Sequence, residues 1–73
     1  GGDSMIAVRD VDLLRTLILK KGYNYAMFSR TINISRSSLN KIFQSAKVSP
    51  VIAHKIASGL NLSFDDLFEI RKP

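Results

Sequence analysis

Apolar residues near the start of the chain recur at steps of three and four, the spacing of one face of an α-helix. They are Leu13, Leu14, Leu17 and Ile18. Asp10 precedes them and suits a helix N-cap, and Gly22 follows them as a common helix terminator. The pattern therefore predicts a helix over residues 11–21.

Four further segments each combine a capping residue with apolar residues at helical spacing. We predict helices over residues 25–31, 36–44 and 50–58, and a short helix that begins at residue 64. Their caps are Asn24, Ser35, Ser49 and Ser63, and Pro50 suits the first position of its helix. The candidate core residues of these helices are Ala26, Phe28, Ile32, Leu39, Ile42, Phe43, Val51, Ile52, Ile56, Ala57, Phe64, Leu67 and Phe68.

The two ends of the chain alternate between apolar and other residues, as strands do. Residues 6–8 and 68–71 follow this pattern, and we expect them to pair, whereas residues 45–48 are predicted to form a loop. We interpret residues 1–4 as an expression-tag remnant and residues 5–73 as a single domain. The predicted fold is mainly α, with five helices and a short two-stranded pairing of the N- and C-terminal segments.

The composition excludes several classes of function. The chain has 73 residues, 45% of them apolar, with no cysteine and one histidine, His54. A single imidazole without a paired base, nucleophile or second ligand forms neither a catalytic nor a metal site. No apolar run is long enough to cross a membrane, and no signal peptide opens the chain. We therefore expect no enzymatic activity, cofactor, metal or small-molecule ligand, and a cytoplasmic location.

The charge is unevenly distributed along the chain. The formal net charge is +5, and no Asp or Glu occurs between Leu13 and Phe64. The cations of this span are Arg15, Lys20, Lys21, Arg30, Arg36, Lys41, Lys47 and Lys55. A small domain with a purely cationic middle projects a positive field, which favours an anionic partner such as nucleic acid.

The helices over residues 25–31 and 36–44 flank Asn33, a residue that tolerates the left-handed conformation of a sharp turn. This arrangement predicts a helix-turn-helix. The outward residues of the second helix are Arg36, Ser37, Asn40 and Lys41. Arg and Lys side chains form hydrogen bonds with guanine, Asn with adenine, and Ser with either base. We therefore predict that this helix enters the major groove of double-stranded DNA.

The segment from Tyr23 to Ile42 resembles the lambda-repressor-like, Cro/CI-type (XRE) helix-turn-helix family. Phe28-Ser29 stands where the family has Leu-Ala, and Asn33-Ile34-Ser35 stands where it has Gly-Val-Ser. Residues 56–67 are similar to the family's Ile-Ala-x-x-Leu-Gly-Val-Ser-x-Asp-Glu-Leu, so the resemblance extends from about Val11 to Leu67.

Two positions depart from the family pattern. The family often has Glu-Asn-Gly after the recognition helix, where this chain has Phe43-Gln44-Ser45. The frequent Gln at the start of the second helix is Tyr25, whose hydroxyl is still able to reach a phosphate.

The resemblance implies a sequence-specific transcriptional regulator, such as a repressor, that binds a two-fold operator as a homodimer. It implies base contacts by Arg36, Ser37, Asn40 and Lys41. It implies phosphate contacts by Asn24, Tyr25, Ser35, Gln44 and Lys47. The alternative is a helix-turn-helix module that binds a partner protein, as an antitoxin does, with weak DNA binding. The acid-free recognition helix favours DNA.

Overall fold

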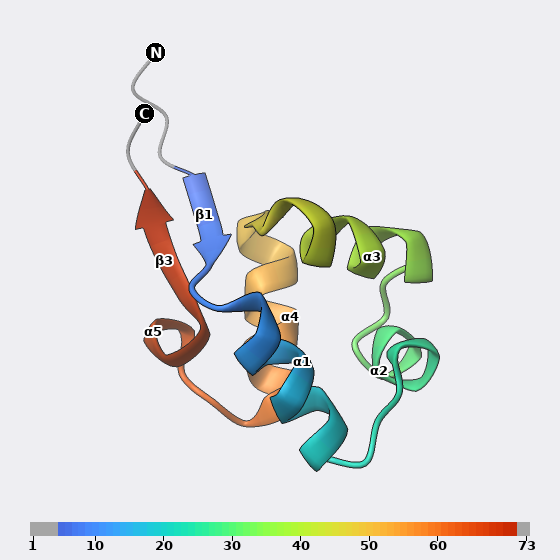
Figure 1. Cartoon of the computed structure of the whole chain (residues 1–73). Helices are drawn as coiled ribbons and strands as arrows, with labels where there is room; N and C mark the ends of the chain where they lie inside the picture. The colour runs from blue at the N-terminus through green and yellow to red at the C-terminus, as the bar shows by residue number, and fades with distance from the viewer. Residues whose placement is uncertain (1–4, 72–73) are drawn as a thin grey trace.

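Side-chain caps start the helices at the predicted residues. The Asn24 carboxamide accepts a hydrogen bond from the Met27 N–H at 2.8 Å, and the Ser35 hydroxyl accepts one from the Ser38 N–H at 3.1 Å. Residues 5–71, the part of the chain described by this computed structural model, form five helices and three strands (Figure 1). The helices are α1 (Val11–Lys20), α2 (Tyr25–Thr31), α3 (Arg36–Ser45), α4 (Pro50–Leu60) and α5 (Phe64–Leu67). The predicted mainly helical fold is confirmed.

Residues in the left-handed region follow three of these helices. Asn33 (φ 60°) follows α2 as predicted, and Asn61 (φ 57°) caps α4. Ala46 (φ 62°) caps α3, and its N–H donates to the Ile42 carbonyl at 2.8 Å. A left-handed alanine costs about 1–2 kcal/mol, because its Cβ approaches the following carbonyl oxygen. The three residues turn the chain sharply, so each next element packs back on the core.

The three strands form one antiparallel sheet. Strand β1 (Met5–Val8) lies in the middle, between β2 (Lys47–Val48) and β3 (Phe68–Arg71). Ile6 lies opposite both Val48 and Ile70. The predicted pairing of the N- and C-terminal segments is confirmed, and β1 and β3 lie side by side (Figure 1).

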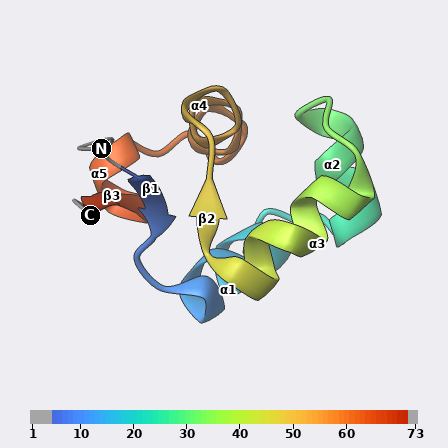
Figure 2. The same ribbon diagram turned by 90° about the horizontal axis from the view of Figure 1, so that it is seen from above.

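Strand β2 corrects the prediction of a loop over residues 45–48. The left-handed turn at Ala46 directs Lys47 and Val48 along β1, where the Val8 N–H donates to the Ala46 carbonyl at 2.8 Å. A two-residue strand is too short to show a period of two, so only the tertiary pairing reveals it. Figure 2 shows β2 passing between α3 and α4.

The core gathers one apolar face from each helix and the inner face of the sheet. Its fully buried side chains include Leu14, Ile18, Phe28, Leu39, Ile56, Leu60 and Phe68. At Gly59, an added Cβ would lie 2.7 Å from Ile32 Cγ2 and 3.3 Å from Phe28 Cε1. Helices α2 and α4 therefore touch at a point that only glycine fits, and this close contact helps to fix the position of α2.

Two expectations for α4 are wrong. The helix continues to Leu60 instead of ending at residue 58, and Val51 is 65% exposed although it is a predicted core residue. The buried face of α4 is formed by Ala53, Ile56, Ala57 and Leu60. Successive helical residues rotate by about 100°, so Val51 faces away from Ala53. The interpretation of residues 1–4 as a tag remnant lies outside the described residues.

Candidate nucleic-acid interface

Helix α3 has one buried face and one polar face. Leu39 and Ile42 are buried at 0% and 3% exposure, as predicted. The polar residues at the complementary positions are all exposed: Arg36, Ser37, Asn40, Lys41 and Gln44. Their spacing places them along one side of the helix. The structure thus brings together the four predicted base-contacting side chains on one solvent-facing surface, which we call the α3 face.

The turn between α2 and α3 is held by backbone and side-chain hydrogen bonds. The Ile34 N–H donates to the Ser29 carbonyl at 2.9 Å, and Ser29 is the buried polar residue among the described ones. Lys55 Nζ of α4 donates to the Asn33 carbonyl at 3.3 Å. These contacts fix the angle between α2 and α3, and with it the direction of the α3 face.

Asn24 and Ser35 both act as helix caps. Besides the Ser38 N–H, the Ser35 hydroxyl contacts the Ser38 hydroxyl at 2.8 Å. Capping explains why Asn24 and Ser35 stand at these positions. Their contacts with phosphate stay a prediction. Each lies exposed at the start of its helix, next to backbone N–H groups that favour anions.

Tyr25 is held by two residues that the sequence did not associate with it. Its phenol oxygen accepts a hydrogen bond from Arg15 Nε at 2.6 Å, and its ring stacks on Phe43 with centroids 4.7 Å apart and planes at 10°. The Arg15 guanidinium also lies over the Phe43 ring, 5.7 Å from its centroid. Arg15, Tyr25 and Phe43 therefore form one cluster that joins α1, α2 and α3, and we call it the Tyr25 cluster.

The hydrogen bond to Tyr25 is the largest cause that raises the pKa of Arg15 above its ordinary value. The hydrogen bond therefore favours the charged form of the guanidinium, which is the donor to Tyr25. In the sequence, Arg15 is one of eight cations in the acid-free span and carries no further signal. No local spacing connects it with Tyr25, ten residues away, and only packing of α1 against α2 does so.

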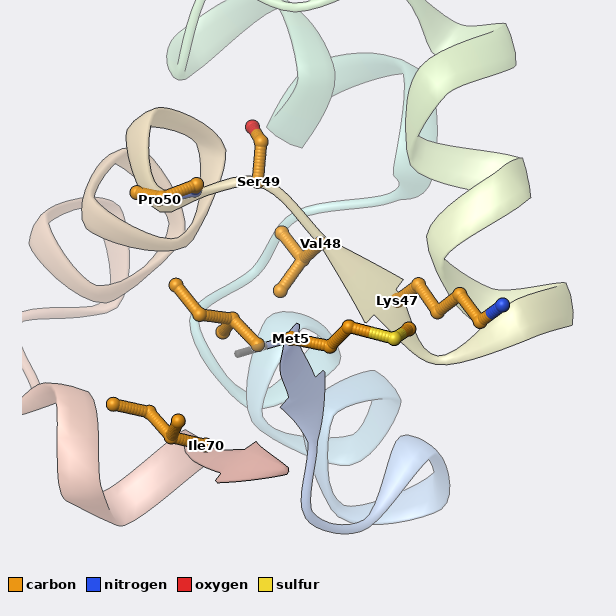
Figure 3. Close-up of a pocket in the computed structure, with 7 residues that line it drawn as sticks. Met5, Lys47, Val48, Ser49, Pro50 and Ile70 are labelled. Carbon is orange, nitrogen blue, oxygen red and sulfur yellow. The ribbon is translucent and has the colours of Figure 1, made fainter. Parts of the chain in front are cut away.

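Gln44 and Lys47 lie beyond the end of the predicted base-contacting set. Gln44 is exposed near the C-terminus of α3, and Lys47 is exposed on β2. Figure 3 shows the Lys47 side chain extending away from the apolar side chains of Val48 and Pro50. Both are accessible to a ligand bound along α3.

The carboxylates of the described residues lie away from α3 in the sequence, and several of them contact other residues of the fold. Asp12 forms an exposed ion pair with Arg15 at 3.5 Å. Asp66 accepts hydrogen bonds from the Ser63 N–H at 3.2 Å and from its hydroxyl at 2.8 Å. No carboxylate occurs in α2 or α3 to repel a phosphate.

Residues 5–71 hold no cluster of three or more His, Cys, Asp or Glu side chains that would bind a metal. Within the same residues, no helix is long and apolar enough to span a membrane. His54 is exposed on α4.

Helices α2 and α3, joined by the left-handed turn at Asn33, define a helix-turn-helix. The family model described as helix-turn-helix matches residues 14–67, which run from α1 to the end of α5. The chain therefore belongs to the Cro/CI-type (XRE) helix-turn-helix family, a family of DNA-binding regulators. No curated protein and no solved structure is similar enough to the chain to count as a match.

Proposed function

We propose that this domain is a sequence-specific regulator of transcription that inserts α3 into the major groove of double-stranded DNA. The observation that carries the proposal is the α3 face, which combines exposed hydrogen-bonding side chains with a complete lack of carboxylates. Its base-contacting residues are Arg36, Ser37, Asn40 and Lys41. Such side chains match the donor and acceptor patterns of base edges in the major groove.

Phosphate contacts hold the helix in register on the duplex. We assign them to residues near the ends of α2 and α3: Asn24, Tyr25, Ser35, Gln44 and Lys47. Tyr25 accepts a hydrogen bond from Arg15, so its own O–H proton is directed elsewhere and is available to a phosphate oxygen. The Tyr25 cluster thus gives the phenol a fixed orientation before DNA binds.

A homodimer on a two-fold operator completes the proposal. The two α3 helices would then enter successive major grooves on one side of the duplex, roughly 34 Å apart. Within one copy, the described residues present one such helix, so a longer site requires a second copy.

The proposal is tested by selecting bound sequences from a pool of random duplexes. We expect a palindromic site, and an affinity whose logarithm falls linearly with the logarithm of the salt concentration. Arg36→Ala should cost about 1–3 kcal/mol of binding free energy and relax the preference at one base pair.

The matched control is Lys21→Ala, which removes the exposed cation that caps the C-terminus of α1. Lys21 lines a surface hollow together with Leu60 and Asn61 at the end of α4 and not with residues of α3. The substitution should lower the affinity for all sequences slightly and equally. Equal losses on every sequence for Arg36→Ala would exclude Arg36 as a base-contacting residue. Failure to bind any duplex at micromolar protein and low salt would refute the proposal and favour the partner-binding alternative.

A further inference from the structure

Most residues assigned to phosphates lie near one end of α3. The Tyr25 ring, next to Asn24, stacks on the Phe43 ring in the last turn of α3, with centroids 4.7 Å apart. Gln44 lies in the same turn, and Lys47 follows on β2. Because α3 has 10 residues, its two ends are about 15 Å apart. The assigned set therefore leaves the N-terminal end of α3 with one residue, the capping serine.

Two arginines line a surface hollow at that N-terminal end. Arg30 lies in the last turn of α2 and Arg36 begins α3, and both line a hollow of about 400 Å³ together with Asn33 and Ile34 of the turn. We call it the Arg30 hollow. Figure 2 shows α3 running from the end of α2 to the start of β2, so the Arg30 hollow and Lys47 lie at opposite ends of α3.

No carboxylate of the described residues neutralises the two guanidinium groups. The lining of the Arg30 hollow contains no Asp or Glu, and the ion pairs within residues 5–71 are formed by Arg15 and Arg71. Arg30 and Arg36 are both exposed. Like charges around one hollow repel each other, so an anion placed between them is favoured.

The backbone between the two arginines is held in place from two sides. The Ile34 N–H donates to the Ser29 carbonyl at 2.9 Å, and Lys55 Nζ of α4 donates to the Asn33 carbonyl at 3.3 Å. The end of α2 and the start of α3 are thus fixed relative to each other before any ligand binds. A site formed in advance costs less free energy to order on binding.

We propose that the Arg30 hollow binds a phosphate group of the DNA backbone, with Arg30 as its main contact. The planar guanidinium is able to donate two parallel hydrogen bonds to two phosphate oxygens. Arg36 lines the other side of the hollow, where its charge strengthens the attraction while its donors remain available to a base edge.

This contact rests on the proposed function and adds to it a residue that the phosphate set lacks. With Arg30, phosphates are bound beyond both ends of α3 and not only near Tyr25 and Lys47. Contacts at both ends of α3 fix its register on the duplex better than contacts at one end, because a single anchored end leaves the other free to swing.

Arg30 has a structural role as well. A cation in the last turn of a helix interacts favourably with the helix dipole, so loss of Arg30 also removes some stability from α2. That loss does not alter how many counterions the protein displaces from DNA. The dependence of affinity on salt reports the displaced counterions, and it therefore separates a phosphate contact from a purely structural role.

The first experiment measures this salt dependence by fluorescence anisotropy, on the selected duplex and on a scrambled one. Arg30→Gln should bind both duplexes about tenfold more weakly, and the slope of log affinity against log salt should become shallower by about 1. Arg30→Lys should keep the wild-type slope, because it retains the charge. The control Lys21→Gln removes an exposed cation outside the Arg30 hollow and should leave the slope unchanged.

The second experiment identifies the phosphate. Phosphates of the selected duplex are replaced one at a time by uncharged methylphosphonates. At one position the wild type should lose affinity while Arg30→Gln should not, because that variant no longer has the contact. Lys47→Gln should be insensitive at a different position, since Lys47 lies at the other end of α3.

Three results would overturn the inference: an unchanged salt slope in Arg30→Gln, a loss confined to the selected duplex, or the same insensitive position for Arg30→Gln and Lys47→Gln. Circular dichroism checks that each variant is folded. A wild-type chain that binds no duplex would refute the proposed function itself. A wild-type chain that binds, beside an Arg30→Gln variant that binds equally well, would remove this inference alone.

Discussion

Arg15 Nε donates a 2.6 Å hydrogen bond to the phenol oxygen of Tyr25, and so joins α1 to the first residue of α2. The same guanidinium lies over Phe43, on which the Tyr25 ring stacks. The hydrogen bond and the stacking together orient the phenol at the start of the helix-turn-helix. The contact between these two residues is therefore a link between the fold and the proposed DNA interface.

Tyr25→Phe is expected to separate the hydroxyl from the ring. The ring should keep its stacking on Phe43, while the proposed phosphate donor and the partner of Arg15 are lost. Affinity should fall about tenfold and equally for all duplex sequences, because a phosphate contact carries no sequence information. Fluorescence anisotropy measures the affinity of the variant for the selected operator and for a scrambled duplex. A loss confined to the operator would contradict a phosphate role.

The hydrogen bond between Arg15 and Tyr25 is expected to give no pH dependence of stability near neutrality. The Arg15 pKa is raised in the folded state, mainly by the Tyr25 hydrogen bond. A cationic group of this kind contributes its full stabilisation below its unfolded-state pKa and loses it only as the pH rises through the folded-state value. Urea unfolding of the wild type and Arg15→Gln should therefore differ by the same amount from mildly acidic to mildly alkaline pH. A difference that changes within this range would contradict the assignment.

Gly59→Ala is expected to destabilise the fold, although alanine favours helices. The new Cβ would approach Ile32 Cγ2 to 2.7 Å, and the branched side chain has little freedom to move away. Overpacking of this kind costs about 1–3 kcal/mol. Thermal unfolding measures the loss. The control is Ser58→Ala at the exposed neighbouring position, which should be neutral or slightly stabilising. Equal stability of the two variants would contradict the prediction, because it would mean that α2 and α4 move apart at little cost to make room for the added Cβ.

Ala46→Gly is expected to stabilise the protein by about 0.5–1 kcal/mol, because glycine adopts a positive φ without the Cβ clash. The control is Ala53→Gly in the buried face of α4, which should destabilise by about 1 kcal/mol or more. Chemical denaturation measures the free energy of unfolding of each variant, which should rise for Ala46→Gly and fall for Ala53→Gly. Destabilisation by Ala46→Gly would show that the alanine methyl packs well enough to offset its strain.

Ser35→Ala and Ser37→Ala are expected to separate folding from DNA recognition within one helix. Ser35 caps α3 through the Ser38 N–H at 3.1 Å, so its loss should cost about 1 kcal/mol of stability. Ser37 lies exposed on the α3 face, so its loss should change stability by less than about 0.5 kcal/mol and weaken operator binding. Unfolding and DNA-binding measurements on each of the two variants test these expectations. A stability loss at Ser37 would show a structural role.

Local signals were sufficient for most of the fold. Asn24, Ser35 and Ser49 start their helices as predicted, because a cap depends only on residues three positions away. The exposure of Arg36 and Lys41 opposite the buried Leu39 also follows from helical spacing. Their roles toward DNA remain predictions, since spacing determines which way a side chain faces and not what it binds.

The sequence by itself determined the five helices, the pairing of the chain ends and the cationic, acid-free α3. These depend on periodicity, capping and composition, which act over a few residues. Only the tertiary structure decided strand β2, the exposure of Val51 and the contact of Arg15 with Tyr25. Each of these depends on which distant segment lies beside the residue, and that is set by the packing of the whole core.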